Sequence, residues 1–146
     1  MSFAIRPVAP KDEPEWRRLW SAYLAFYESS VPETVTETTF ARLLDPQRSQ
    51  QDALVAEQNG KLVGFVHFIF HAHNWRVEDV CYLQDLFVDP SVRGAGVGHA
   101  LIEAVYAEAD RRGSPSVYWL TQDFNTRARA LYDRVARLTP FVKYQR

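Results

Sequence analysis

Apolar and polar positions alternate along the chain in two different rhythms, which predict helices interleaved with strands. Residues 3–8 alternate as a short strand, and aromatic residues then recur at helical spacing from Trp16 to Tyr27. A second helix is predicted over residues 37–44, because a residue that precedes a proline such as Pro46 rarely stays helical. The first third of the chain is therefore predicted to be a strand followed by two helices.

The rest of the chain adds more strands and two more helices. Asn59-Gly60 is a strong signal for a tight hairpin between two strands. Cations and Gly113 close a third helix, and Asn125 is placed to cap a fourth that runs to about Ala136. The predicted strands of this part cover residues 53–57, 62–70, 80–88, 116–121 and 141–144. Helices interleaved with strands in the order β-α-α-β-β-β-α-β-α-β, together with this hairpin, predict a mixed α/β sheet rather than a purely parallel one.

A glycine-rich turn lies where the strand over residues 80–88 meets the third helix. It reads Arg93-Gly94-Ala95-Gly96-Val97-Gly98-His99 and follows Pro90. Such a junction presents unpaired N–H groups at the positive end of a helix dipole, and glycines let a ligand approach the main chain closely. This is typical of a binding site for phosphate.

The glycine spacing separates the possible phosphate ligands. The third glycine comes two positions after the second, which departs from the dinucleotide pattern G-x-G-x-x-G. His99-Ala100 stands where a Walker loop needs Lys followed by Ser or Thr. A Rossmann-type nucleotide site is weakened but stays open, because Asp123 lies near the end of the next strand.

The string from Arg93 to Gly98 resembles the acetyl-CoA pyrophosphate loop Arg-x-x-Gly-x-Gly of the GNAT N-acetyltransferases. The segment from Tyr82 to Val88 is similar to that of the spermidine/spermine and thialysine acetyltransferases, which carry Glu where this chain has Gln84. Nearly the whole chain resembles the fungal histone-and-polyamine and D-amino-acid acetyltransferase group. That likeness is carried by Trp16, Leu19, Trp20, Tyr23, Phe26, Tyr27, Glu28, Asp45, Pro46, Trp75 and residues 115–119.

The resemblance implies acetyl-CoA as co-substrate and a homodimer or higher homo-oligomer. It also implies the GNAT fold, an α/β fold with a mixed, mostly antiparallel central sheet and helices on both faces. In that fold the strand before the glycine turn splays away from the next strand, and its exposed main chain binds the pantetheine arm. Phe87 and Val88 would then donate their N–H groups to the arm and to the acetyl carbonyl. The family's Gly-Phe pair after the last helix is replaced here by residues 135–138, so the path of the C-terminal strand stays open.

Asn125 and Tyr132 are seven residues apart and share one face of the predicted fourth helix. The resemblance implies that the Tyr132 hydroxyl protonates the departing thiolate, a step that a phenol of pKa ~10 can perform. The residues expected to contact the cofactor are Phe87, Val88, Arg93, Gly94, Ala95, Gly96, Gly98, His99, Asn125 and Tyr132.

The acceptor amine must lose a proton before it can attack, and Asp85 is the best-placed acid for that step or for holding the ammonium. The alternative is that Asp85 simply meets a basic neighbour. Gln84 cannot accept a proton. By the resemblance, Tyr27 and Glu28 at the end of the first long helix wall the acceptor pocket, where aromatic rings and an acid suit a cation.

Composition and charge limit the binding partners and the cellular compartment that we expect. A net charge of −1 argues against a nucleic-acid partner. One cysteine, Cys81, excludes an internal disulfide, and with no membrane-spanning stretch or signal-peptide pattern it predicts a cytoplasmic protein. His67, His71 and His73 share one side of an extended chain, but no acid or thiol joins them at ligand spacing, so no metal is assigned.

Together these observations predict a single domain over residues 1–146 that acetylates a primary amine of a polyamine, an amino acid or a related metabolite in a ternary complex with acetyl-CoA. A protein or histone lysine is the alternative acceptor. Because Gln84 replaces an acid, a non-catalytic acyl-CoA-binding module also stays open.

Overall fold

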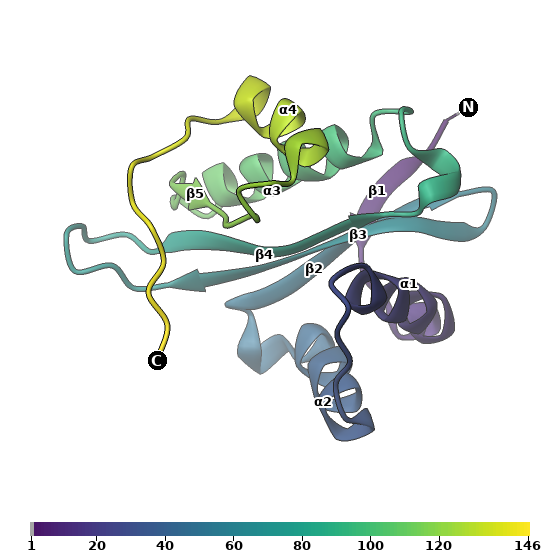
Figure 1. Cartoon of the computed structure of the whole chain (residues 1–146). Coiled ribbons are helices and arrows are strands. Elements are labelled where there is room, and N and C mark those ends of the chain that lie inside the picture. Colours follow the sequence, from purple (N-terminus) through teal and green to yellow (C-terminus); the bar gives the residue numbers. More distant parts are fainter. Residues whose placement is uncertain (1) are drawn as a thin grey trace.

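The computed structural model describes residues 2–146 and contains one five-stranded sheet in the order β1-β2-β3-β4-β5 (Figure 1). All neighbouring strands are antiparallel except β4 and β5, which are parallel. The elements are β1 (Ala4–Pro7), α1 (Glu13–Phe26), α2 (Glu33–Leu44), β2 (Gln51–Gln58), β3 (Lys61–His71), β4 (Val80–Val88), α3 (Val97–Arg111), β5 (Val117–Tyr118) and α4 (Thr126–Val135). This is the mixed α/β sheet that the order of apolar patterns predicted.

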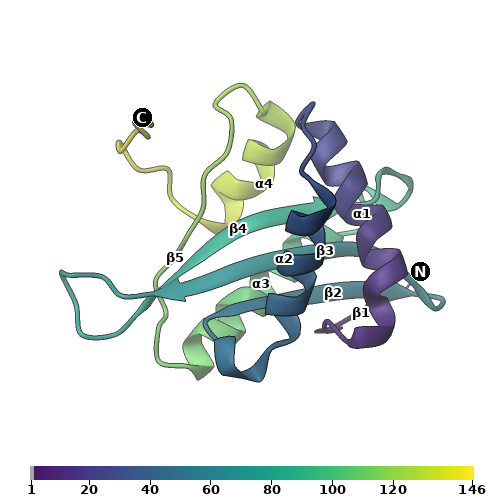
Figure 2. The same ribbon diagram turned by 90° about the horizontal axis from the view of Figure 1, so that it is seen from below.

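The helices cover both faces of the sheet. α1 and α2 lie on one face, and α3 and α4 lie on the other (Figures 1 and 2). Two buried clusters fill the layers: Trp16, Leu19 and Phe65 belong to the α1–α2 side, whereas Leu101 and Phe68 belong to the α3 side. Alternate residues of the central strands therefore serve opposite cores, as the two-residue period of a strand requires.

The hairpin between β2 and β3 forms where it was predicted. Asn59 and Gly60 both have positive φ angles, 52° and 78°. A tight turn with two such residues matches the right-handed twist of the strands that it joins. This turn sets the register that brings Phe65 opposite Val55 in the centre of the sheet.

β4 and β5 separate soon after they meet. They pair only at Cys81 with Val117 and at Tyr82 with Tyr118. β4 also carries a bulge opposite the step from His67 to Phe68 of β3. The second half of β4 therefore has a free edge, as the family resemblance implied, and that edge opens toward α4.

Three predicted elements need correction. The strand predicted over residues 116–121 forms only over Val117–Tyr118, the two residues that pair with β4. The strand predicted over residues 141–144 does not form: the chain has no regular structure after α4, and Phe141 and Tyr144 are 82% and 94% exposed. A strand needs a partner for its main-chain hydrogen bonds, and sequence alternation alone does not supply one. The second helix begins at Glu33 instead of residue 37, because Pro32 precedes its first turn and its threonines obscured the periodic pattern. Within residues 2–146, no helix has the length and apolar character needed to cross a membrane.

Candidate active site

The glycine turn forms the N-terminal end of α3. Gly94 and Gly96 have φ angles of 90° and 85°, a region that side chains with a Cβ rarely adopt. The first helical hydrogen bond runs from the Ala100 N–H to the Gly96 carbonyl, over 3.0 Å. The N–H groups that precede Ala100 therefore lie before the helix's own bonding pattern begins.

Five of these N–H groups are left without an acceptor among residues 2–146. They belong to Gly94, Gly96, Val97, Gly98 and His99. They sit at the positive end of the α3 dipole, where an anion is stabilised. The turn therefore presents a cluster of free main-chain donors at the place where the sequence predicted a phosphate site.

Ala95 does not take the role that the sequence predicted for it. Its N–H donates to the Val92 carbonyl over 3.3 Å, and its side chain is absent from the pocket wall. The Arg93 N–H is likewise used, by the Pro90 carbonyl, but the Arg93 side chain does line the pocket. Bonded and free N–H groups therefore alternate along the turn. The bonded ones donate to carbonyl groups of the short 3-10 turn over Pro90–Val92.

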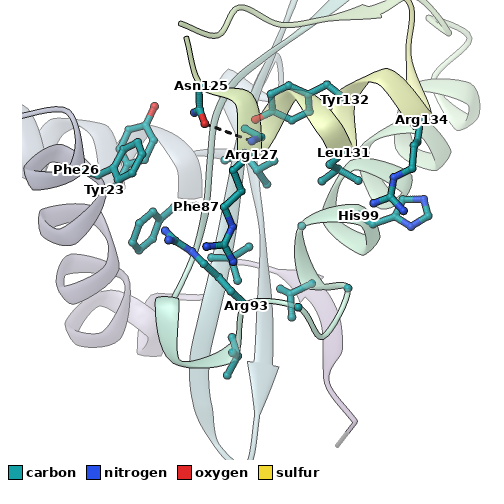
Figure 3. Close-up of a pocket in the computed structure, with 18 of the residues that line it drawn as sticks. Tyr23, Phe26, Phe87, Arg93, His99, Asn125, Arg127, Leu131, Tyr132 and Arg134 are labelled. Atoms are coloured by element: carbon teal, nitrogen blue, oxygen red, sulfur yellow. Dashed lines mark hydrogen bonds between the residues drawn. The ribbon is translucent and has the colours of Figure 1, made fainter. Parts of the chain in front are cut away.

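A pocket of about 540 Å³ runs from this cradle along the free edge of β4. Figure 3 shows Tyr23 and Phe26 of α1 on one side of it and Asn125 and Tyr132 of α4 on the other. It is lined by Tyr23, Phe26, Tyr27, Leu86, Phe87, Val88, Val92, Arg93, Gly94, Gly96, Val97, Gly98, His99, Asn125, Arg127, Ala128, Leu131, Tyr132 and Arg134. Nearly all cofactor-contact residues predicted from the sequence thus meet at one place.

The main chain of β4 offers N–H groups to this pocket, but not all those expected. The Asp89 N–H donates to the Val63 carbonyl of β3 over 2.8 Å. Because successive residues of a strand point their N–H groups to opposite sides, that of Phe87 also faces β3, and those of Leu86 and Val88 face the free edge. Of the two N–H groups that the sequence analysis expected as donors, that of Val88 therefore faces the free edge and that of Phe87 does not, whereas that of Leu86 does. The strand parity set by the bulge, which a sequence does not display, decides the difference.

Asn125 and Tyr132 lie on the pocket side of α4, as their spacing predicted (Figure 3). The Asn125 Oδ1 accepts a hydrogen bond from the Ala128 N–H over 3.3 Å, so this residue caps the helix. Burial, with a smaller contribution from nearby Tyr27, raises the pKa of Tyr132 to about 12. The phenol is therefore fully protonated near neutral pH and is available as a proton donor.

Three arginines bring positive charge to the pocket. Arg93 comes from the glycine turn, and Arg127 and Arg134 come from the first and last turns of α4. Figure 3 shows the side chains of Arg93 and Arg127 extending toward one another from the turn and from α4, with Arg134 beside His99. Arginines are concentrated in the last quarter of the sequence, but only the fold shows that Arg127 and Arg134 of that group line the pocket.

The side of the pocket formed by the end of α1 is aromatic. Tyr23 and Phe26 of α1 and the C-cap residue Tyr27 line it, whereas Glu28 does not. Glu28 ends the helix in a left-handed conformation with φ 53° and lies exposed to solvent. The pairing of Tyr27 with an acid that the sequence predicted is therefore only half present.

Asp85 lies behind the aromatic wall. Its Oδ1 accepts a hydrogen bond from the Tyr23 hydroxyl over 2.7 Å, and its Oδ2 lies 2.9 Å from His67 Nδ1. Asp85 itself is absent from the pocket wall. Tyr23 and His67 were not predicted from the sequence as partners of Asp85. The available signal for Tyr23 was that it lies four residues before Tyr27, on the same face of the helix. No group of three or more His, Cys, Asp or Glu side chains within the described chain is placed to hold a metal ion.

The chain is similar in sequence to known proteins. The model of the acetyltransferase (GNAT) family matches residues 16–136. D-amino-acid N-acetyltransferase HPA3 of Saccharomyces cerevisiae is 43% identical over 143 residues, which cover 97% of this chain and 89% of that protein. Thialysine N-epsilon-acetyltransferase of Bos taurus is 32% identical over 49% of this chain and 41% of its own length.

Solved structures share the fold at low sequence identity. Aminoglycoside acetyltransferase AAC(6')-Iy, determined with a bisubstrate analogue of CoA, superposes with a TM-score of 0.87 at 22% identity, over 100% of this chain and 98% of its own. Ribosomal-protein-alanine N-acetyltransferase of Brucella melitensis has a TM-score of 0.82 at 22% identity, over 99% and 98% of the two chains.

Proposed function

The chain belongs to the acetyltransferase (GNAT) family and is an N-acetyltransferase, and from this premise we propose that it transfers the acetyl group of acetyl-CoA to a primary amine of a small molecule. The acceptors proposed are an amino acid, a polyamine or a related metabolite. The similarity to a D-amino-acid N-acetyltransferase supports free amino acids, including D-enantiomers, as the first acceptors to test.

The five acceptor-free N–H groups of the glycine turn are the main support for acetyl-CoA. A diphosphate has several anionic oxygens, and charge-assisted hydrogen bonds to them are roughly twice as strong as neutral ones. Arg93, Arg127 and Arg134 add cations at the same mouth, which suits a ligand with several phosphate groups. The residues present therefore fit coenzyme A, which supplies the activated acetyl group when bound.

The free edge of β4 would hold the acyl end of that ligand. The N–H groups of Leu86 and Val88 face the pocket and can bind the pantetheine arm and polarise the thioester carbonyl. The Tyr132 phenol, raised in pKa but protonated, would donate its proton to the departing thiolate. The amine would attack directly, because the pocket brings the acceptor wall of α1 and the cofactor wall of α4 together.

The assembly and location of the enzyme are further parts of this proposal. Leu138, Phe141 and Tyr144 of the C-terminal segment are each more than 70% exposed, and contact with a second copy would bury such side chains. We expect a homodimer or higher homo-oligomer. Light scattering on the protein as it elutes from a size-exclusion column measures its mass and tests this. Buried Cys81, whose pKa burial raises to about 12, is an inert thiol compatible with the cytoplasm.

The function is tested with acetyl-CoA and a panel of acceptors, scored by release of free thiol. The panel contains L- and D-amino acids, polyamines and a histone peptide. Turnover of small amines with little turnover of the peptide supports the proposal, whereas preference for the peptide refutes the acceptor class. Thermal unfolding with CoA and with NAD tests the cofactor separately, because a true ligand stabilises the fold in proportion to ln(1 + [L]/Kd).

A further inference from the structure

A chain of hydrogen bonds leads from the acceptor wall into the core beneath it. The Tyr23 hydroxyl donates to Asp85 over 2.7 Å, and Asp85 Oδ2 lies 2.9 Å from His67 Nδ1. The other ring nitrogen of His67, Nε2, lies 3.0 Å from the indole Nε1 of Trp16. Trp16 is fully buried and His67 is 4% exposed, so water does not compete for these bonds. Three elements, α1, β3 and β4, contribute to this line.

The bond from Trp16 determines the protonation of the line. An indole N–H can only donate, so Nε2 of His67 must carry a lone pair. A neutral imidazole then holds its proton on Nδ1, where it points at Asp85. Asp85 consequently accepts from His67 on one oxygen and from Tyr23 on the other, which is the bonding of an ionised carboxylate.

This carboxylate has no cationic partner in the described part of the chain. The contrast is Asp12, which is 5% exposed and is bound by both terminal nitrogens of Arg6 at 2.8 Å. Asp85 has only the neutral His67 as its nominal ion-pair partner, and its side chain is 14% exposed. A buried carboxylate without a counter-ion attracts any cation that can approach it.

None of the groups that face Asp85 from its neighbouring elements carries a positive charge in this hydrogen-bond arrangement. Tyr23 and Tyr27 face it from α1, His67 from β3 and Tyr82 from its own strand. Burial, with a smaller contribution from the negative charge of Asp85, raises the pKa of each of these three tyrosines. The electrostatic demand for a positive charge at this place is therefore left to the ligand.

We propose that Tyr23 is the catalytic residue that receives the acceptor ammonium and passes its proton to Asp85, with His67 as the positioning residue that holds Asp85 in place. Tyr23 lines the pocket, and because its own proton is directed at Asp85, the lone pairs of its oxygen are free to accept an N–H from the amine. The inference rests on the proposed function, since it requires a cationic amine as the acceptor.

The proton balance involves no additional reactant: the first proton of the ammonium goes to Asp85, and the second, released as the amide forms, replaces the proton that Tyr132 gives to the thiolate. One N–H proton of the ammonium moves to the Tyr23 oxygen as the Tyr23 proton moves to Asp85 Oδ1, so the amine gains a free lone pair and the phenol stays neutral. A charge pair becomes a neutral pair, which is favoured when the ammonium loses its hydration in an aromatic pocket. The proton returns to solvent by the same path after the product leaves.

The test is the Tyr23→Phe variant, which keeps the ring and removes the hydroxyl. Acetylation of a D-amino acid from the acceptor panel is measured from pH 7 to pH 10. We expect kcat/KM for the amine to fall about 100-fold at pH 7, the scale of a lost proton-transfer group, with unchanged affinity for CoA. The deficit should shrink toward pH 10, because an amine of pKa ~10 is then about half neutral, against about one molecule in 1,000 at pH 7.

Tyr82→Phe is the matched control. Tyr82 is also close to Asp85 and loses the same atom, but it does not line the pocket, so its profile should follow that of the parent enzyme. A Tyr23→Phe deficit that is the same at every pH, or absent at pH 7, overturns the relay. An unmodified enzyme that acetylates no amine defeats the proposed function itself, so the two failures are distinguishable.

His67 is tested by two substitutions. Asn can present an N–H near the position of Nδ1, whereas Leu cannot, so His67→Asn should retain the alkaline rescue pattern and much of the activity that His67→Leu loses. Unfolding temperatures of both variants separate loss of stability from loss of positioning. Equal kcat/KM and equal pH profiles for the Asn and Leu variants would show that His67 does not orient Asp85.

Discussion

Replacing Gly96 with alanine separates the anion cradle from ordinary backbone stability. Gly96 has a φ of 85°, and a Cβ built on it meets no atom within 4 Å. The substitution therefore introduces no clash, only the cost of a left-handed conformation for a residue with a Cβ, which is about 1 kcal/mol. For a chain of this size that corresponds to a fall in Tm of about 3 °C.

The effect on CoA should be larger than this. Relief of the strain rotates the peptide groups that present the N–H groups of Val97 and Gly98 at the start of α3. Losing one hydrogen bond to a charged phosphate costs about 1.5–3 kcal/mol, which weakens binding about 10- to 100-fold. Isothermal titration with CoA measures this change, and thermal unfolding without ligand measures the stability change.

Gly113→Ala is the matched control at the other end of α3. Gly113 has a φ of 74°, also has open space at its Cβ position, and lies outside the pocket wall. It should lose similar stability and keep the parent affinity for CoA. If both variants bind CoA as the parent does, the acceptor-free N–H groups of the turn are not the phosphate site and the reasoning is wrong.

Three further variants test other parts of the structure. Tyr132→Phe should lower kcat by about 100-fold or more while the affinity for CoA stays unchanged. Because the pKa of Tyr132 is about 12, its ionisation should cause no loss of parent activity below pH 10. Thiol release measured at fixed times checks both expected activities. Gly64→Ala should destabilise the fold by about 1–3 kcal/mol in urea unfolding, because its Cβ would lie 3.0 Å from the Phe87 carbonyl oxygen; an unchanged midpoint would contradict this packing. Arg6 lowers the pKa of Asp12. The stabilising contribution of that carboxylate is therefore complete above its ordinary pKa of 3.8 and is lost as the pH falls through the lower pKa of the folded state. The stability deficit of Asp12→Asn should be present at pH 7 and vanish in strong acid.

Features that depend on a few neighbouring residues were readable from the sequence. Asn59-Gly60 formed its predicted turn, Asn125 capped its helix, and Gly113 ended α3 with a φ of 74°. The Ser114 N–H closes that last turn on the Ala109 carbonyl over 2.9 Å. In each case the residue type itself selects the backbone conformation, so no distant partner is needed.

Features that depend on distant partners were not readable in this way. Tyr23 and Asp85 are 62 residues apart, and Trp16 and His67 are 51 apart. The predicted alternative for Asp85 was a basic neighbour, and the neighbour proved to be a histidine kept neutral by a tryptophan. The C-terminal alternation predicted a strand, but no edge of the sheet pairs with it.

By itself, the sequence determined where the chain turns, where helices begin and end, and that a glycine-rich turn would meet the N-terminus of α3. These follow from main-chain sterics and local hydrogen bonds, which act over a few residues. The tertiary structure alone decided which amides of β4 face the pocket, which arginines reach its mouth, and that Asp85 lacks a counter-ion. Those properties arise from the pairing of strands and the packing of α1 on the sheet, where the environment of a charge is set by residues far away in the sequence.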